Sequence, residues 1–381
     1  MNFKPRSIVL LCLAVLGASS GQALAQGCVV ARGAGMPAVQ FGSSPVEHQS
    51  DRVTHRDTRS SKFDIAVGYR SFVSDRHFVG TEEQKERQQE GSQVINTSSF
   101  LDIALTYRVS DRYFMSLSVP YVDHDRSQVV RDNSPQRTIL ERFHTQASGL
   151  GDLRLTGYAW TRQPTSETRS NLLIGLGVDM PTGKKDVYDN FKAYNAATQQ
   201  IVSRRQTVDQ SIQPGDGGWG AIIDLYGYHR LTERVTLYAS GVYTITPQET
   251  SGVQTFRSNP FESEMSIADS YLARLGADFL LGDTHSFMLS LGGRIEGVPV
   301  NDLVGGSDGF RRPGYSVAAE VGAIYDFKHG ISAGLYFDSA LIRNRQRSVP
   351  DQQLTESSGV YRHGDAAFAD QLWMVSLKKQ F

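Results

Sequence analysis

Apolar and polar residues alternate along most of the chain after residue 60. A period of two is typical of a β-strand that has one apolar and one polar face. The first such segment places Phe63, Ile65, Val67 and Tyr69 on one face and Lys62, Asp64, Ala66 and Arg70 on the other.

The same pattern recurs to the end of the chain and gives twelve segments in all. The later apolar stripes run over residues 101–107, 113–121, 153–159, 172–180, 219–225, 235–243, 271–279, 287–291, 317–325, 331–341 and 373–377. Short turns, such as Ser110-Asp111, alternate with much longer polar connections. Even strand numbers with this alternation are typical of bacterial outer-membrane barrels. The sequence therefore predicts an all-β fold, an antiparallel transmembrane β-barrel of about twelve strands with short periplasmic turns and long extracellular loops.

A soluble sandwich or a lipocalin-like barrel would also alternate, but it would turn its apolar face inward. The predicted strands are longer and more numerous than those of most secreted sandwiches. The last segment, with Trp373, Val375, Leu377 and the final Phe381, resembles the terminal strand of bacterial outer-membrane barrels, although Lys379 interrupts its stripe. We therefore favour the membrane barrel. We also expect the outer-membrane assembly machinery to recognise this strand, which ends at Phe381.

Aromatic residues near the ends of the stripes are candidates for the girdles that flank the lipid-facing band of such a barrel. They are Tyr69, Tyr107, Tyr113, Tyr121, Tyr325 and Trp373.

Residues 1–25 have the pattern of a secretory signal peptide. Basic residues precede an apolar run at 8–18, and small residues at 23–25 form a cleavage site. The run is shorter than the about 20 residues that a membrane-spanning helix needs. The predicted organisation is a signal peptide (1–25), a flexible periplasmic arm or plug (26–60) and an outer-membrane barrel (61–381) in a Gram-negative cell.

Cleavage after residue 25 would leave Cys28 as the single cysteine, which excludes an internal disulfide. Cys28 is then either a mobile thiol or a lipoprotein cysteine, for which Ala25-Gln26-Gly27 is a poor lipobox.

Composition changes this picture little. A hydrophobic fraction of 39%, 36 glycines and a mean hydropathy of −0.33 suggest a soluble protein. A membrane barrel has the same average, because only alternate residues face lipid. A net charge of −1 and a pI near 6.8 argue against nucleic acid as a partner, which would need a concentrated basic surface.

The polar face of the strands carries charges of both signs together with tyrosines. In a barrel this face points inward. The predicted pore-lining residues are Arg70, Arg108, Asp152, Arg154, Asp224, Tyr226, Tyr238, Arg274, Arg294, Glu320, Tyr336 and Asp338. They would line a narrow water-filled path for a small solute, or they would form salt-bridged layers that fill the barrel. A twelve-stranded barrel lies between the filled and the open sizes, so both interpretations remain.

Motifs for catalysis or metal binding are weak. The sequence has no Walker loop, no His-Glu-x-x-His and no cysteine pair for a metal. One Gly-x-Ser-x-Gly match, at 305–309, lies in a predicted outer loop without a following helix, whereas a nucleophile elbow needs one. We therefore predict no enzymatic activity and no cofactor.

Two barrel hydrolases remain as alternatives. Asp123-His124-Asp125 is similar to the acidic residues that omptin-type proteases use to activate water, but no second Asp–His pair is evident on a facing strand. Outer-membrane phospholipase A, also a twelve-stranded barrel, uses Ser, His and Asn. His229 and His363 are the candidates here, and both look isolated in the sequence.

Three glycine-rich blocks resemble the recurring motifs of one outer-membrane family. They are GLGDLRL at 149–155, MPTGKKD at 180–186 and QPGDGGW at 213–219. The family is named after the MetA pathway of phenol degradation, and the likeness covers most of residues 60–381. It implies a barrel channel, often encoded near genes for aromatic degradation, and it carries no catalytic residues. Sequence after Lys184-Lys185 departs from the family pattern.

The expected function is an outer-membrane channel for passive uptake of a small solute, with aromatic compounds as one class. Its partners would be membrane lipid and that solute. The alternatives are a closed barrel that binds through outer loops such as 81–91 and 182–215, or an outer-membrane hydrolase.

Overall fold

The structure is a computed structural model that describes residues 62–381 except 166, 258, 283–285 and 328. The predicted signal peptide, the arm at 26–60 and Cys28 lie outside the described residues.

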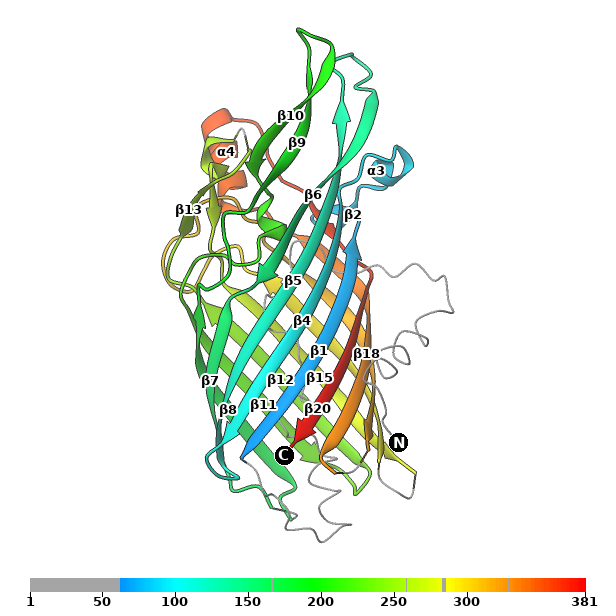
Figure 1. Ribbon diagram of the computed structural model, residues 1–381, viewed down its shortest axis with the longest axis vertical. Coiled ribbons are helices and arrows are strands. Elements are labelled where there is room, and N and C mark those ends of the chain that lie inside the picture. The colour runs from blue at the N-terminus through cyan, green and yellow to red at the C-terminus, as the bar shows by residue number, and fades with distance from the viewer. Residues whose placement is uncertain (1–61, 166, 258, 283–285, 328) are drawn as a thin grey trace, which may run out of the picture.

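Twelve antiparallel strands form a closed barrel (Figure 1). In chain order they are β1 (Phe63–Ser74), β4 (Ile95–Arg108), β5 (Tyr113–Arg131), β7 (Leu153–Trp160), β8 (Ser170–Met180), β11 (Gly220–Arg230), β12 (Val235–Ile245), β15 (Ser270–Leu281), β16 (Phe287–Val298), β17 (Gly314–Asp326), β18 (Ile331–Arg345) and β20 (Gln371–Gln380). Each strand pairs with the next, and β1 pairs with both β4 and β20. The barrel wall therefore has no open edge.

All twelve predicted strands are present, with the predicted faces. Along β1, exposed and buried residues alternate: Ile65 is 37% exposed and its neighbour Asp64 only 3%. The apolar stripes lie on the outside of the barrel. This arrangement is opposite to that of a soluble sandwich or lipocalin-like barrel, in which the apolar face is buried.

Short connections join the strands at one end of the barrel, which we call the turn end. They are the described turns 109–112 and 231–234 and the links between β7 and β8, between β15 and β16, and between β17 and β18. Two of these turns use a hydroxyl to bind the returning backbone. Ser110 Oγ accepts from the amides of Arg112 and Tyr113, and Thr232 Oγ1 accepts from those of Arg234 and Val235. These local bonds hold the register of the flanking strands.

Long connections at the opposite end, the loop end, contain secondary structure of their own. Their elements are β2 (Arg76–Val79), β3 (Glu82–Glu83), α3 (Lys85–Gln89), β6 (Ile139–Leu150), β9 (Tyr188–Asn195), β10 (Gln200–Thr207), η2 (Gln210–Ile212), β13 (Thr250–Gln254), η3 (Pro260–Glu262), β14 (Glu264–Ser266), α4 (Val349–Ser358) and β19 (Ala366–Phe368). The hairpin of β5 with β6 and the hairpin of β9 with β10 rise above the barrel (Figure 1). No helix among the described residues is long and apolar enough to cross a membrane.

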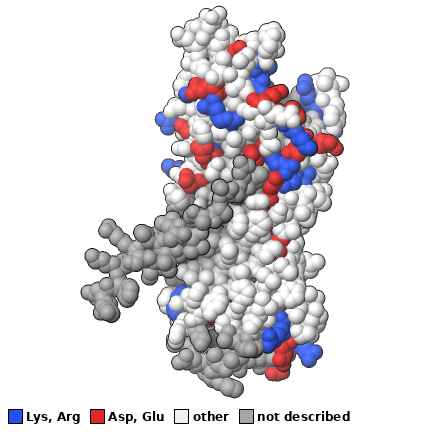
Figure 2. Space-filling view, turned by 90° about the vertical axis from the view of Figure 1, so that its right-hand side faces the viewer, with Lys and Arg blue, Asp and Glu red and all other residues white. Residues whose placement is uncertain are grey.

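A belt of apolar side chains surrounds the barrel. Figure 2 shows most of the charged side chains at the loop end, a few at the turn end, and a broad uncharged surface between them. The predicted girdle residues are all exposed on the outside: Tyr69, Tyr107, Tyr113, Tyr121, Tyr325 and Trp373. Lys379, which interrupts the last stripe, lies at the turn end and donates to the carbonyl of His329. Its charge therefore lies at the rim of the belt.

The barrel interior also holds apolar residues that the alternation did not identify, because they occupy inward positions. One cluster on β5, β7, β8, β11 and β12 consists of Phe114, Tyr158, Trp160, Leu173, Tyr226, Tyr228 and Tyr238. A second cluster lies on β15 to β20 and consists of Leu280, Met288, Ile324, Tyr336 and Met374. The inner face is thus a mixture of aromatic and charged groups.

Replacing an outward residue in the middle of the belt by arginine should destabilise the barrel. Leu225, halfway along β11, is exposed on the outer face. We expect Leu225→Arg to cost about 2–4 kcal/mol in lipid, because a charge near the bilayer midplane must leave water. Leu231→Arg, at the turn end of the same strand, should cost only about 0–1 kcal/mol. Denaturant unfolding in lipid vesicles measures both, and equal losses would contradict a membrane-spanning belt.

Candidate functional site

The predicted pore-lining residues lie on the inner face of the barrel, with one exception. Most are buried, and Arg108 and Asp224 are partly buried. Asp152 lies between β6 and β7, at the loop-end rim. Lys62, assigned to the inward face of the first segment, precedes β1 and is exposed.

The inner charges form ion pairs that run along the barrel wall. Their nitrogen–oxygen distances are 3.1 Å for Arg70–Asp102, 2.6 Å for Arg108–Asp64, 3.0 Å for Arg154–Asp179, 2.5 Å for Arg294–Glu296 and 2.9 Å for Arg294–Asp338, and Arg274 pairs with Glu320. Each pair lies within one strand or joins strands that are adjacent or next but one in the ring. The wall therefore neutralises its own charges, as buried ions require.

Glycines allow inner tyrosines to lie close against the wall. A Cβ atom on Gly276 or Gly292 would lie 2.6 Å from Tyr238 Oη, closer than two atoms can pack. The same arrangement holds for Gly322 beside Tyr336 and for Gly175 beside Tyr158. Tyr238 Oη donates to Glu320 at 3.2 Å. The glycines thus fix where the phenol groups meet the ion pairs.

Several buried polar atoms of the inner face have no hydrogen-bond partner among the described residues. They are Arg70 Nη1 and Nη2, Tyr226 Oη, Arg274 Nε, Arg294 Nε, Glu296 Oε1, Ser316 Oγ, Asp338 Oδ1 and Ser376 Oγ. They come from many strands of the ring, so they are not a local defect. Polar atoms in folded proteins rarely remain unpaired, because each costs about 1–3 kcal/mol.

A segment at residues 208–216, which we call the strap, lies across the loop end of the barrel. Although it belongs to a loop, Val208 and Ile212 are fully buried and pack against Ala147 of β6. Gln213 holds the turn of the strap through bonds to the backbone of Val187 and Val208. The strap is therefore a docked element and not a solvated loop.

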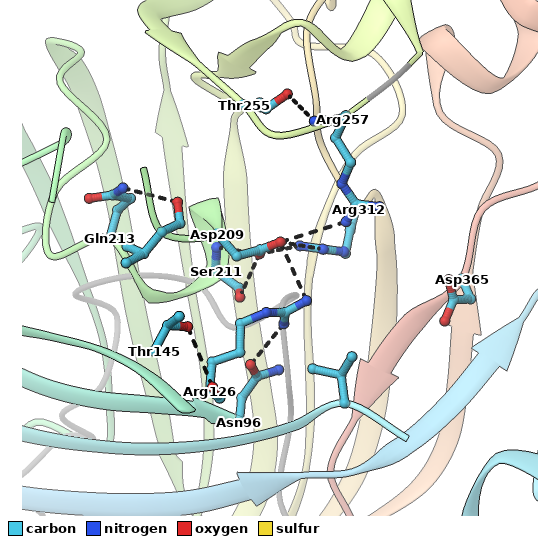
Figure 3. Close-up of polar contacts among 12 residues, drawn as sticks. Asn96, Arg126, Thr145, Asp209, Ser211, Gln213, Thr255, Arg257, Arg312 and Asp365 are labelled. Carbon is cyan, nitrogen blue, oxygen red and sulfur yellow. Dashed lines mark hydrogen bonds and ion pairs between the residues drawn. The ribbon is translucent and has the colours of Figure 1, made fainter. Parts of the chain in front are cut away.

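The strap carries a fully buried carboxylate, Asp209 (Figure 3). Arg312 binds both of its oxygens, at 2.8 and 2.9 Å. Arg126 and Arg257 lie 3.4 and 3.6 Å from Oδ2. The amide and hydroxyl of Ser211 complete the shell, at 3.0 and 2.8 Å from Oδ1.

The three arginines reach Asp209 from different sides of the ring. Arg126 lies on β5, Arg312 precedes β17, and Arg257 follows β13, between β12 and β15. Between β5 and β17, the ring holds β4, β1, β20 and β18 on one side and six strands on the other. Because the three cations converge from nearly opposite walls, Asp209 lies near the barrel axis, at the outer mouth.

The carboxylate of Asp209 keeps its negative charge throughout the physiological pH range. Burial alone would raise the pKa of its carboxyl, but Arg126, Arg312 and Arg257 outweigh burial and hold it well below its usual range. Burial lowers the pKa of Arg257, and the neighbouring Arg312 adds to this effect. Asp209 therefore remains ionised and holds the strap to these arginines at all physiological pH values.

The sequence analysis missed this cluster. None of its residues forms a motif, and Asp209 and Arg312 are 103 residues apart. One signal was available, since Val208, Ile212 and Pro214 are apolar residues within a long polar connection.

The three glycine-rich blocks of the sequence meet at the loop-end rim, around Asp152. Its carboxylate accepts from the amides of Gly183 and Asp216, at 2.9 and 3.0 Å. A Cβ atom on Gly183 would lie 2.9 Å from the backbone of both Gly151 and Gly215. Asp152 was predicted to line the pore, but it instead ties the blocks together and anchors the end of the strap.

The residues considered for hydrolysis are not isolated, but the structure does not bring them together. Asp125 binds His144 of β6 at 2.7 Å, on the outer face of the hairpin above the loop end. Ser170 Oγ lies 2.6 Å from His229 Nδ1, at the turn end. His363 instead binds the carbonyl of Arg345. The 305–309 match lies in a loop, as predicted, and Ser307 Oγ accepts from the amide of Asp302.

No protein-family model matches the sequence, and no curated protein matches it. The barrel is similar to the COG4313 outer membrane channel from Pseudomonas putida F1, with 13% identity, a TM-score of 0.53, and 84% of this chain and 96% of that chain covered. A Pseudomonas aeruginosa FadL homologue matches with 11% identity, a TM-score of 0.43, and 94% and 96% covered. The translocator domain of autotransporter NalP from Neisseria meningitidis matches with 11% identity, a TM-score of 0.44, and 89% and 93% covered. The first likeness establishes the outer-membrane barrel fold, and the other two are too distant to add to it.

Adding one methyl group beneath Tyr238 should disturb the inner wall. In Gly292→Ala the new Cβ would lie 2.6 Å from Tyr238 Oη and 2.7 Å from the carbonyl oxygen of Leu275, so both the ring and the neighbouring strand must move, and the ring loses its bond to Glu320. We expect a loss of about 1–3 kcal/mol, as for other overpacked sites. Gly293→Ala is the matched control, because its Cβ would meet its nearest atom at an ordinary 3.7 Å. Denaturant unfolding of the two variants compares them, and equal stability would contradict the packing described.

Asp209→Asn should loosen the strap. The substitution keeps the shape but leaves the arginines without their anion, which costs about 3–5 kcal/mol for a buried pair. Because the pKa of Asp209 is lowered by folding, its contribution is complete above about pH 4 and is lost only as pH falls further. Amide hydrogen exchange at 208–213 should therefore be faster in the variant between pH 5 and 8. Asp132→Asn, in the exposed outer hairpin, serves as control, and unchanged exchange in Asp209→Asn would overturn the role of the cluster.

Proposed function

We propose that this protein is a channel in the outer membrane of a Gram-negative cell, through which a small solute diffuses passively. The loop end faces outward and the turn end faces the periplasm, as the alternation of long and short connections favours. In this proposal β20, which is followed by Phe381, is the strand that the assembly machinery recognises.

The observation that carries the proposal is the set of unpartnered polar atoms on the inner face. Arg70 and Asp338 are the strongest cases, because their groups are charged and buried. Nε of Arg70 binds Asp102 and its guanidinium lies 3.9 Å from the centre of the Phe100 ring, but both terminal nitrogens lack a hydrogen-bond partner among the described residues. In a dry interior these atoms would remain unpaired, and the free-energy cost of each one would add to that of the others. In the channel that we propose, movements of the inner side chains admit water to these atoms, and a hydrated wall provides a path for small solutes.

The arrangement of the inner side chains supports such a path. Ion pairs such as Arg154–Asp179 and Arg274–Glu320 join nearby strands, and glycines hold Tyr238 against the wall. Side chains that stay near the wall leave the axis to water. The strap and Asp209 lie at the outer mouth, so the entrance is narrower than that of a general porin. We therefore expect a selective channel for small molecules.

The resemblance to the phenol-degradation family favours an aromatic solute. The buried cluster of Trp160, Tyr226 and Tyr228 offers ring faces on the inner wall near the turn end. In the solved structure with the same fold, the protein is described as an outer membrane channel. Phenols and aromatic acids are accordingly the first solutes to examine.

Single-channel recording of the refolded mature chain, residues 26–381, in a planar bilayer tests the proposal. We expect discrete conductance steps that phenol or benzoate reduces. Asp209→Ala should increase the conductance, because the strap loses its attachment at the mouth. The Asp132→Ala variant, in the exposed hairpin, should conduct like the original protein.

A correctly folded barrel that shows no conductance, even with Asp209→Ala, would reject the channel. The closed barrel that binds through its outer loops would then be the better interpretation. Migration of the unheated protein on a denaturing gel establishes that the barrel is folded in each case.

A further inference from the structure

A polar pocket of about 80 Å³ lies beneath the strap, at the outer mouth of the barrel. Gln210 and Ser211 of the strap form one side of it. The loop-end parts of β12 and β15 form another, through Thr244 and Ser270. A single water needs about 10–15 Å³ on the same measure, so the pocket holds a molecule of several heavy atoms.

Five of the thirteen residues that line this pocket carry hydroxyl groups, and Asp179 and Asp216 add two carboxylates. The hydroxyl groups belong to Ser211, Thr244, Thr246, Ser266 and Ser270. Thr244 Oγ1 accepts from Arg154, so its own hydrogen remains to be donated. Thr246 Oγ1 donates to Asp269, so it remains an acceptor. The Ser270 hydroxyl, which has no bond to any other residue that the structure describes, can do both.

The cations around the pocket already have their anions. Arg311 binds both oxygens of Asp302, at 2.8 and 2.6 Å, and Arg312 binds both oxygens of Asp209. An anionic solute would have to break one of these bidentate pairs, and a cationic solute would have to compete with Arg154 for Asp179 of the lining, which Arg154 binds at 3.0 Å. Both are costly in a buried site.

From these observations we infer that the pocket beneath the strap binds a small uncharged molecule that carries two or more hydroxyl groups. Each solute hydroxyl donates and accepts, which matches the mixed capacity of Thr244, Thr246 and Ser270. The inference rests on the proposed channel. It adds a class of solute distinct from the aromatic compounds considered above, and the first site that this solute meets. Ser270 is the residue whose side chain is free to recognise that solute.

Liposome swelling with the full mature chain tests this inference. Erythritol is the hydroxylated probe, and glycine betaine is a probe of similar size that is zwitterionic and has no hydroxyl group. We expect faster swelling in erythritol. Ser270→Leu should slow erythritol entry about tenfold, because the leucine fills the pocket and removes the free hydroxyl. Ser357→Leu, on the exposed face of α4, makes the same substitution outside the pocket and should leave the rate unchanged.

Two results would overturn the inference while the channel stands: equal or faster entry of glycine betaine, or an unchanged erythritol rate in a folded Ser270→Leu protein. Ion conductance of the same preparations separates this case from failure of the channel itself. If neither ions nor solutes cross, the proposed function fails, and the inference that rests on it fails as well.

Discussion

The pairing of β1 with β20 is the interaction on which the rest of the structure depends. A strand in lipid has no water to bond its backbone, so each strand must have a neighbour on both sides. The ladder from Asp64–Gln380 to Ser71–Trp373 joins the two ends of the described chain and leaves no edge in the wall. Once the ring is closed, every side chain faces either lipid or the interior, and the alternation of the sequence decides which.

Closure also explains the character of the interior. The inner face of a ring of this size is too crowded for its large side chains to point freely toward the axis. Two features place these large side chains along the wall. Charged side chains form ion pairs between nearby strands. Tyrosines lie over glycines, as Tyr238 does over Gly292. The polar atoms that remain without protein partners then need water, which links the packing of the wall to the proposed conduction.

How much the sequence predicts follows from the range of each interaction. The period of two is local, so it located all twelve strands and the face on which residues such as Arg274 and Glu320 lie. Structure inside the long loops depends on contacts between distant segments, and Asp209 with Arg312 left no local pattern. The sequence misplaced Asp152 for a related reason. It continues the alternation of its strand by one residue, but it lies beyond the strand, where contacts with Gly183 and Asp216 decide its role.

The two groups of buried charges differ in what they connect, and this difference bears on transport. Pairs such as Arg154–Asp179 join neighbouring strands, so the barrel can keep them whatever passes along the axis. Asp209 instead connects the strap, which belongs to a loop, to arginines from nearly opposite walls. A solute entering from the loop end must pass beside this connection. The pocket that contains Ser270 is lined on one side by Gln210 and Ser211 of the strap. In the channel that we propose, recognition and access at the mouth therefore depend on the same short segment, while the wall below supplies a hydrated and electrically balanced path.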